Sequence, residues 1–238
     1  MGASDAAARL EMARGLLQRA EDRADRARPA PEVDGRVLPV VAPLARLLPA
    51  GGLRRGTTVA VPAGPAATSL LWAVLAEASA EGAWVGVVGR PDLGLVAAAE
   101  AGMRLERLAL VPSPGPELIA VTSALLDGLD VVVMVGTRPV PAGERQRLAA
   151  RARQRGAVLC ALGPWPGADV RLSCPDARWN GLDGGSGRLG ERLVTVRVLG
   201  RGLAPAGQEE RLLMPGRSGA TVAQAPAEAP AARVRLAG

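Results

Sequence analysis

The chain has 238 residues and a formal net charge of +6, and 48% of its residues are apolar. This length and composition predict one folded domain with a substantial core. No apolar run approaches the roughly 18 residues of a membrane helix, and the charged N-terminus lacks a hydrophobic signal segment. We therefore expect a cytoplasmic protein without a membrane partner, and we leave association with the nucleoid open.

The residues that the chain lacks exclude most kinds of active site. It has no His, Tyr or Phe, and all 29 of its basic residues are arginine. A Ser-His-Asp or Cys-His nucleophile, a lysine Schiff base and a histidine-ligated metal are therefore impossible. Cys160 and Cys174 form no CxxC pair, so we expect two buried thiols, no metal and no cofactor. The positive charge permits an acidic partner such as nucleic acid.

Residues 1–36 predict a helix and a linker. From Ser4 to Arg28, Leu and Ala recur at three- and four-residue spacing, with Ser4 as the cap, and Pro29 and Pro31 end the helix. The apolar stripe either packs against the chain's own core or docks on a partner.

Residues 37–216 predict the folded domain, in which short apolar segments alternate with Ala/Leu-rich helical ones. We expect an extended piece at Val37–Val41, a helical turn at Leu44–Leu48, a turn at GGLRRG, strands at Thr57–Val61, Ala83–Val88, Leu108–Val111, Asp130–Val135 and Ala157–Leu162, and helices at Thr68–Ser79, Leu93–Ala101, Pro116–Leu126 and Gly143–Arg155. Because these strands are apolar throughout, both faces of the sheet should be buried. The pattern predicts an α/β fold with a mostly parallel sheet flanked by helices.

The C-terminal part of this domain changes in character. The segments DVRLSCPDARWNGL and RLVTVRVLGRG alternate apolar and polar residues, and DGGSG separates them as a turn. This alternation predicts an antiparallel extension of the sheet. Residues 217–238 are rich in Ala, Pro, Gly and Arg and predict a disordered tail.

The segment LARLLPAGGLRRGTTVAVPAGPAATSLLWAVLAEASAEGAWVGVV resembles the start of the RecA-like ATPase core, in which a Gly-Gly-Leu turn leads into a strand, a phosphate loop and a helix. The likeness continues through AAEAGMRLERLALVPSP and LLDGLDVVVMV. It covers about Leu38 to Leu162 and extends more weakly to Gly202. In its length and its ARWNGL segment, the chain looks most like the ImuA-type proteins of the actinobacterial ImuA-prime kind. The resemblance implies an accessory factor of the mutasome, which carries out SOS-induced translesion synthesis.

The phosphate loop of that family has lost its chemistry in this chain. A working loop needs glycines for close backbone approach, a lysine for the phosphates and a hydroxyl for the metal. By alignment on Thr68 and Ser69, the lysine position falls on Ala67 and the preceding glycine on Ala66. The remnant comprises Gly64, Pro65, Ala66, Ala67, Thr68 and Ser69. We interpret Thr68 as the helix cap.

The two carboxylates of the family's site are missing as well. Val135 stands where an apolar strand should end in the metal-binding Asp, and VVGRPDL follows the neighbouring strand where the catalytic Glu is usual. Asp92 is out of register and is interpreted as the cap of the next helix. Since cation, metal ligand and base are lost together, we expect no nucleotide hydrolysis, no catalytic residue and no enzyme.

Tryptophans and arginines are the candidate interaction residues. Trp72 and Trp84 are expected in the core, whereas Trp165, and Trp179 beside Arg178, are expected as exposed anchors. Arg147, Arg151 and Arg155 share one helix face. That face is either a solvated surface or a patch for DNA phosphates or an acidic partner.

The expected function is therefore that of a non-catalytic RecA-like scaffold in DNA repair, acting by protein–protein interaction. By resemblance, its partners are an ImuB-type polymerase-like protein and a C-family translesion polymerase, with RecA as a further candidate. The segment from about Arg178 is the expected docking element. One alternative is a nucleotide-binding regulator or weak ATPase, in which Arg90 or Arg138 replaces the lysine. Another is a protein that binds DNA weakly and without sequence specificity.

Overall fold

The computed structural model describes residues 36–136, 139–183, 186–215 and 223–224. The predicted N-terminal helix and nearly all of the predicted tail lie outside these residues, so both stay predictions. None of the helices in the described part is long and apolar enough to span a membrane.

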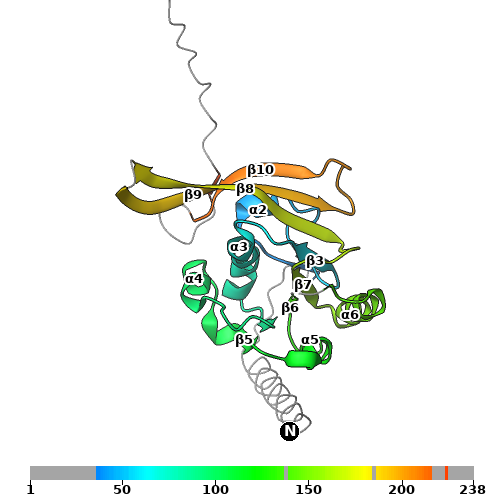
Figure 1. Ribbon diagram of the computed structural model, residues 1–238. Helices are drawn as coiled ribbons and strands as arrows, with labels where there is room; N and C mark the ends of the chain where they lie inside the picture. The colour runs from blue at the N-terminus through cyan, green and yellow to red at the C-terminus, as the bar shows by residue number, and fades with distance from the viewer. Residues whose placement is uncertain (1–35, 137–138, 184–185, 216–222, 225–238) are drawn as a thin grey trace, which may run out of the picture.

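The described residues form a mixed sheet of nine strands in the order β11-β10-β9-β8-β3-β7-β6-β4-β5, with helices packed around it (Figure 1). Its strands are β3 (Thr58–Val61), β4 (Val85–Val88), β5 (Leu108–Val111), β6 (Val131–Val135), β7 (Val158–Leu162), β8 (Val170–Asp183), β9 (Ser186–Gly200), β10 (Gln208–Leu213) and β11 (Ala223–Gln224). The α-helices are α2 (Ala42–Ala45), α3 (Ala67–Ala80), α4 (Leu95–Glu100), α5 (Leu118–Leu125) and α6 (Ala142–Arg155), and short 3-10 turns lie at Leu105–Arg107 and Gly115–Glu117. A separate two-stranded sheet pairs β1 (Val37–Leu38) with β2 (Leu53–Arg54).

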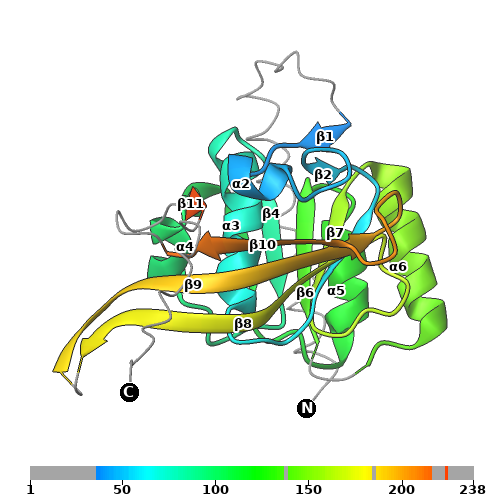
Figure 2. The same cartoon turned by 90° about the horizontal axis from the view of Figure 1, so that it is seen from above.

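The parallel half of the sheet is covered on both faces (Figure 2). Alternate residues of each strand point to opposite sides. Val59 of β3 and Val133 of β6 pack in one cluster with α3, whereas Ala60 and Met134 pack in the other with α5 and α6. Apolar side chains are therefore needed at every strand position, which is why these strands are continuous apolar runs. The predicted α/β class with a mostly parallel, helix-flanked sheet is confirmed.

Most predicted bounds agree with the structure to within two residues, but several local predictions are wrong. Leu53–Arg54, predicted as part of a turn, forms β2 and pairs with β1. Thr68 does not cap its helix, because α3 starts one residue earlier with Ala66 as an N-cap that makes no side-chain bond. Asp92 does not cap α4 either, since Gly94 occupies that position.

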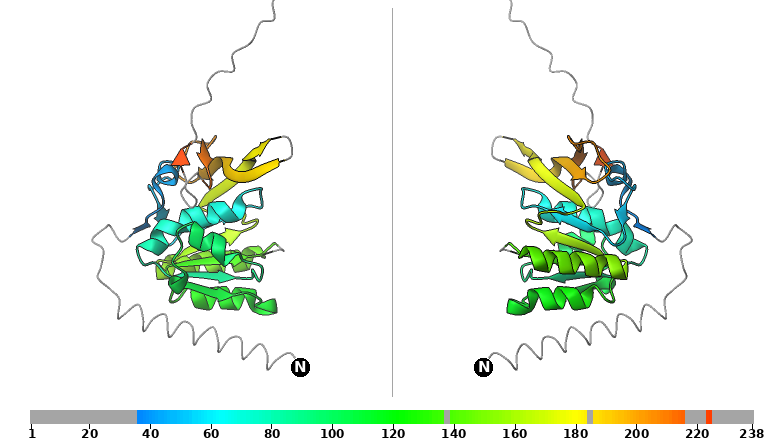
Figure 3. Two further views of the ribbon diagram at one scale, coloured as in Figure 1. Left: turned by 90° about the vertical axis from the view of Figure 1, so that its left-hand side faces the viewer. Right: turned by 90° about the vertical axis from the view of Figure 1, so that its right-hand side faces the viewer.

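The antiparallel part of the sheet starts one strand later than the sequence predicts. β8 joins the sheet in parallel, with Val170 opposite Val59 of β3. It then pairs antiparallel with β9 along its length, and β10 and β11 follow antiparallel. We call residues 176–183 of β8 and 186–194 of β9 the arm. Figures 2 and 3 show that the end of this hairpin extends past the helical body.

Helix α3 lies between the parallel sheet and these antiparallel strands, in the middle of the molecule (Figure 1). Leu172 of β8 and Val196 of β9 belong to the same core cluster as Leu70 and Trp72 of α3. Ten of the fourteen residues of α3 are buried. The start of this helix is therefore enclosed by elements from both halves of the sheet.

Candidate functional site

Three adjacent strands bring the predicted positions to one edge of the sheet. Val61 at the end of β3 and Val135 at the end of β6 both align with Leu162 of β7. Neighbouring strands lie about 4.8 Å apart, so these two positions are separated by about 10 Å. Residues 62–66 leave β3 at this edge and lead into α3. The structure thus places the loop and the Val135 position at the same edge of the sheet.

The loop is closed by its own backbone. The Ala67 N–H donates to the Gly64 carbonyl oxygen at 3.2 Å, so it does not point freely outward. Ala66 and Ala67 are buried, whereas Ala63, Gly64 and Pro65 are exposed. None of these side chains carries charge, so the loop itself offers a triphosphate no neutralising group.

The antiparallel strands pack against the other side of the loop. A Cβ atom at Gly64 would lie 3.1 Å from the Cys174 carbonyl oxygen of β8, so glycine permits this close approach. Arg192 of β9 donates from Nη1 to the Pro65 carbonyl oxygen at 3.5 Å, and from Nε to the Met214 carbonyl oxygen at 2.9 Å. The loop is therefore held by a guanidinium from a strand far away in the sequence.

Arg192 is the functional candidate that the sequence reasoning missed. It is buried, and its Nη2 has no hydrogen-bond partner in the part of the chain that the structure describes. An unpaired buried donor costs about 1–3 kcal/mol, and a charged one costs more. The sequence contains a pattern that points to Arg192. Every second residue of β9 faces the same side, and this side carries Arg192 followed by the buried residues Val194, Val196 and Val198. An arginine in phase with buried valines is an unusual inward-facing charge.

No carboxylate among the described residues shifts the pKa of the Arg192 guanidinium. Burial lowers the pKa of the Arg192 guanidinium, and the nearby Cys174 thiol opposes this shift. Burial also raises the pKa of Cys174 to about 11, so this thiol is uncharged near neutral pH. The arginine itself stays protonated. Its ring neighbour is Trp179, whose centroid lies 4.9 Å from the guanidinium carbon.

Gly89 and Arg90 follow β4 at the same edge of the sheet. Gly89, which follows β4, has φ of +87°, and a Cβ there would lie 2.6 Å from the Val135 carbonyl oxygen. Arg90 is committed to Asp92, with Nε and Oδ1 2.8 Å apart. Arg138, the other arginine predicted as a lysine substitute, lies outside the described residues.

The tryptophans divide differently from the prediction. Trp165 is only 6% exposed and packs in the core cluster beside α6, so its prediction as an exposed anchor is wrong. Trp72 is buried and Trp84 is half-buried, whereas Trp179 is 45% exposed, as expected of an anchor.

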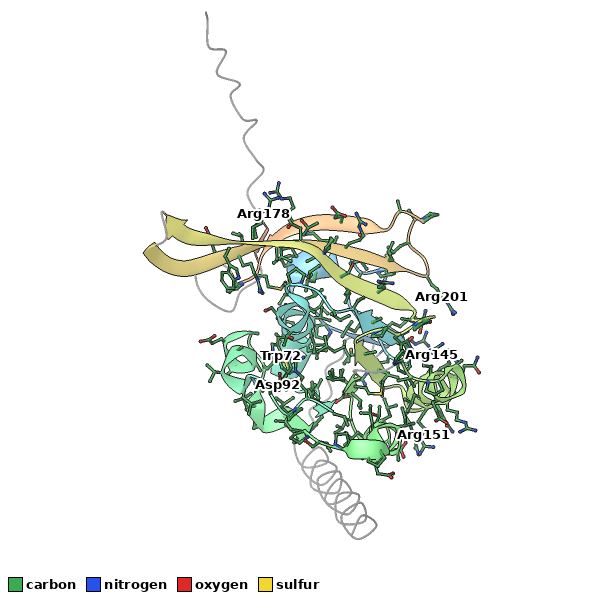
Figure 4. All side chains as sticks on the ribbon, viewed as in Figure 1. Trp72, Asp92, Arg145, Arg151, Arg178 and Arg201 are labelled. Atoms are coloured by element: carbon green, nitrogen blue, oxygen red, sulfur yellow. The ribbon has the colours of Figure 1, made fainter. Side chains whose placement is uncertain are left out.

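Arg178 and Trp179 point to opposite sides of the arm, because successive strand residues alternate. Arg178 pairs with Asp176 at 3.4 Å and points away from the helices (Figure 4). Trp179 lies directly opposite Arg192 on the inner face. The two predicted anchors therefore do not form one contact surface.

The three arginines predicted to share a helix face are each matched by a carboxylate. Arg147 pairs with Glu144 on α6 at 2.9 Å. Arg151 and Arg155 both pair with Asp127, which follows α5. Figure 4 labels Arg151 on the side of the molecule where α5 and α6 lie. The hydrogen bond from Arg151 lowers the pKa of Asp127. These contacts favour the interpretation of a solvated structural surface over that of a phosphate patch.

The fold and this edge define the class of protein. It is a mixed α/β protein with a mostly parallel sheet, in which the loop after β3 has no charged side chain and is covered by antiparallel strands of the same chain. The family model for the MT3502 N-terminal domain matches residues 46–167. The chain therefore belongs to the MT3502 N-terminal domain family.

An uncharacterized protein of Mycobacterium tuberculosis, Rv3395c, is 43% identical to this chain over 131 residues, which are 53% of this chain and 63% of that protein. The chain thus covers less than two thirds of this relative. The family match includes β3 to β7 and helices α3 to α6. Arg192 and Trp179 lie beyond the matched residues, so the family match bears on the loop and not on the arm.

Proposed function

We propose that this protein is a non-catalytic RecA-like accessory factor of the ImuA-prime kind, which acts as a scaffold in SOS-induced translesion DNA synthesis. Its proposed partners are an ImuB-type polymerase-like protein and a C-family translesion polymerase, with RecA as a further candidate. Its proposed location is the cytoplasm. The proposal rests on the sequence resemblance, and the mostly parallel α/β sheet is compatible with it.

One observation supports the scaffold role above the others: backbone groups of the loop are hydrogen-bonded within the protein. The Gly64 carbonyl oxygen accepts the Ala67 N–H, and Arg192 binds the Pro65 carbonyl oxygen. In a phosphate loop, successive backbone N–H groups turn toward the ligand. Here a carbonyl oxygen instead accepts from a guanidinium, and Val135 supplies no metal ligand.

In this proposal the core has no working nucleotide site, so the surface is the part of the molecule that acts. Trp179 supplies an exposed aromatic anchor on the arm, and tryptophan and arginine are common hot-spot residues of protein interfaces. Function by binding a protein partner is thus more consistent with this geometry than function by chemistry.

The test is co-purification of the tagged full-length chain from nuclease-treated extract of its own DNA-damaged host, with the untagged chain as control. We expect recovery of the ImuB-type protein and the C-family polymerase. Recovery of neither from folded bait would refute the scaffold proposal. Recovery that depends on intact DNA would instead favour a DNA-binding protein, whose affinity should fall steeply with salt.

A thermal-unfolding assay with millimolar Mg-ATP separates the scaffold from the nucleotide-binding alternative. A ligand that binds only the folded state must raise the melting temperature. We expect no rise, because the loop lacks a free cation and its first helical N–H is already bonded. A dose-dependent rise would support a nucleotide-binding regulator and count against the scaffold as formulated.

A further inference from the structure

The strongest unexplained feature of the molecule is the unpartnered guanidinium nitrogen of Arg192. The residue is only 7% exposed, and Nη2 is fully buried and has no acceptor among the described residues. Its partners among the described residues are two carbonyl oxygens and a tryptophan ring. Buried charges in native proteins are paired, and unsatisfied buried donors have a specific explanation. An anionic acceptor from outside the described residues would satisfy this donor.

The start of α3 points to the same conclusion independently. This helix has fourteen residues, its N-cap Ala66 makes no side-chain hydrogen bond, and its first turn contains no acidic residue. The N–H groups of a first turn lack intrahelical acceptors and carry partial positive charge. Arg192 binds the Pro65 carbonyl oxygen, one residue ahead of this cap. A guanidinium and a helix N-terminus therefore meet at one place, a combination that favours an anion.

The surroundings indicate which kind of anion fits. Arg192 contacts two exposed residues, Trp179 through its ring and Pro65 through its carbonyl oxygen, and both present mainly apolar surface. A polyphosphate needs many donors, and the Ala67 N–H is already used. A single carboxylate flanked by apolar side chains matches two or three donors beside an aromatic ring.

We propose that Arg192, the N-terminal end of α3 and the ring of Trp179 form a receptor site for a partner protein segment that carries an Asp or Glu next to an apolar residue. In this proposal the Trp179 ring moves aside from Arg192, the carboxylate pairs with Nη2 and the helix N-terminus, and the apolar residue packs on the displaced ring. This inference rests on the proposed scaffold function and specifies the chemistry of the partner segment.

The experiment selects random short peptides displayed on phage against the full-length chain. Enriched sequences are then synthesised with a fluorescent label and measured by anisotropy. We expect enriched peptides to carry Asp or Glu beside Leu, Ile, Val or Phe. Replacing that Glu by Gln in the peptide should weaken binding by about tenfold or more, the loss typical of a charged hot spot. This comparison alters only the peptide and leaves the protein's folding untouched.

Protein variants then locate the site. Trp179→Ala should weaken binding by about tenfold or more. Arg192→Gln should abolish the difference between the Glu and Gln peptides, provided that its circular dichroism spectrum matches that of the unsubstituted chain. Arg178→Ala is the matched control, because Arg178 is one residue from Trp179 and faces the other side of the arm. It should bind normally.

Five results would overturn the inference. One is the absence of acidic residues among the enriched peptides, and another is equal binding of the Glu and Gln peptides. A third is pyrophosphate or oligo-dT binding that is lost in Arg192→Gln, which would make the site a phosphate site. The fourth is stronger peptide binding by full-length Glu228→Gln, which would assign the site to the chain's own tail. Normal recovery of the polymerase partners by Trp179→Ala would refute this site and leave the scaffold function standing.

Discussion

The contact between Asp169 and Thr58 joins the two halves of the sheet, and its removal gives a sharp stability prediction. Asp169 precedes β8, and its Oδ2 accepts from both the N–H and the hydroxyl of Thr58, each at 2.9 Å. The Asp169 N–H donates back to the Thr58 hydroxyl oxygen at 3.0 Å. Thr58 is buried at 3% exposure. Asp169→Ala therefore leaves a buried N–H without its acceptor.

The magnitude follows from the burial of that donor. Leaving a buried donor unsatisfied costs about 1–3 kcal/mol, so we expect a loss of about 2 kcal/mol in the free energy of unfolding. In a domain of this size, each kcal/mol lowers the melting temperature by about 2–4 °C, so the expected shift is about 4–8 °C. Urea unfolding followed by tryptophan fluorescence measures the free energy, and an unchanged m-value keeps the comparison valid.

The matched control is Asp176→Ala. Asp176 pairs with Arg178 at 3.4 Å with both side chains exposed, and such surface pairs contribute less than about 1 kcal/mol. Asp169→Asn retains a carbonyl oxygen that can accept from Thr58 and should recover part of the loss. If Asp169→Ala costs no more than Asp176→Ala, the hydrogen bonds described above do not hold β8 to β3.

Three further predictions concern other parts of the molecule. The lowered pKa of Asp127 means that its ion pairs stabilise the protein above the ordinary carboxyl pKa of about 3.9 and lose this effect as the pH falls through the lower folded value. Asp127→Asn should therefore lower the free energy of unfolding by at most about 1 kcal/mol at neutral pH. This difference in stability between the variant and the unsubstituted chain should vanish in acid, and a difference that grows in acid would contradict the prediction. Burial raises the pKa of Cys160 to about 12 and that of Cys174 to about 11, so neither thiol should react with a disulfide reagent until denaturant is added, and rapid native labelling would refute their burial. Gly89→Ala should destabilise the protein by about 1–3 kcal/mol in urea unfolding, because φ is positive and the new Cβ meets the carbonyl oxygen at the end of β6; an unchanged midpoint would contradict the strain.

The parallel strands were predictable because local sequence and burial agree in them. Val131–Val135 is apolar at every position and is covered on both faces by helices, so its pattern is strong. β2 was not predictable in this way, since two residues inside a glycine-rich segment carry no periodicity. Its pairing with β1 depends on a contact across the chain, which the sequence does not display.

The candidate site was only half visible in the sequence for the same reason. The loop could be located because it follows a recognisable strand, and Val135 because it is the last residue of another. Arg192 reaches Pro65 across 127 residues of sequence, so no local pattern joins them. The prediction of an exposed Trp165 is wrong because tertiary packing buries its ring in the core. Exposure of a loop side chain depends on tertiary packing and not on the neighbouring residues alone.

The position of β3 between β7 and β8 has a consequence for how binding is mapped. β3 is internal only because β8 pairs with it, and the inner face of β8 and β9 covers α3 with Leu172, Val194 and Val196. A variant that ends near residue 178 loses β9 and β10 and uncovers the apolar side of α3. Open strand edges and bare apolar surface lead to aggregation. Loss of binding after such a truncation would therefore report misfolding, and single substitutions on the inner face of the arm are the way to locate a docking site.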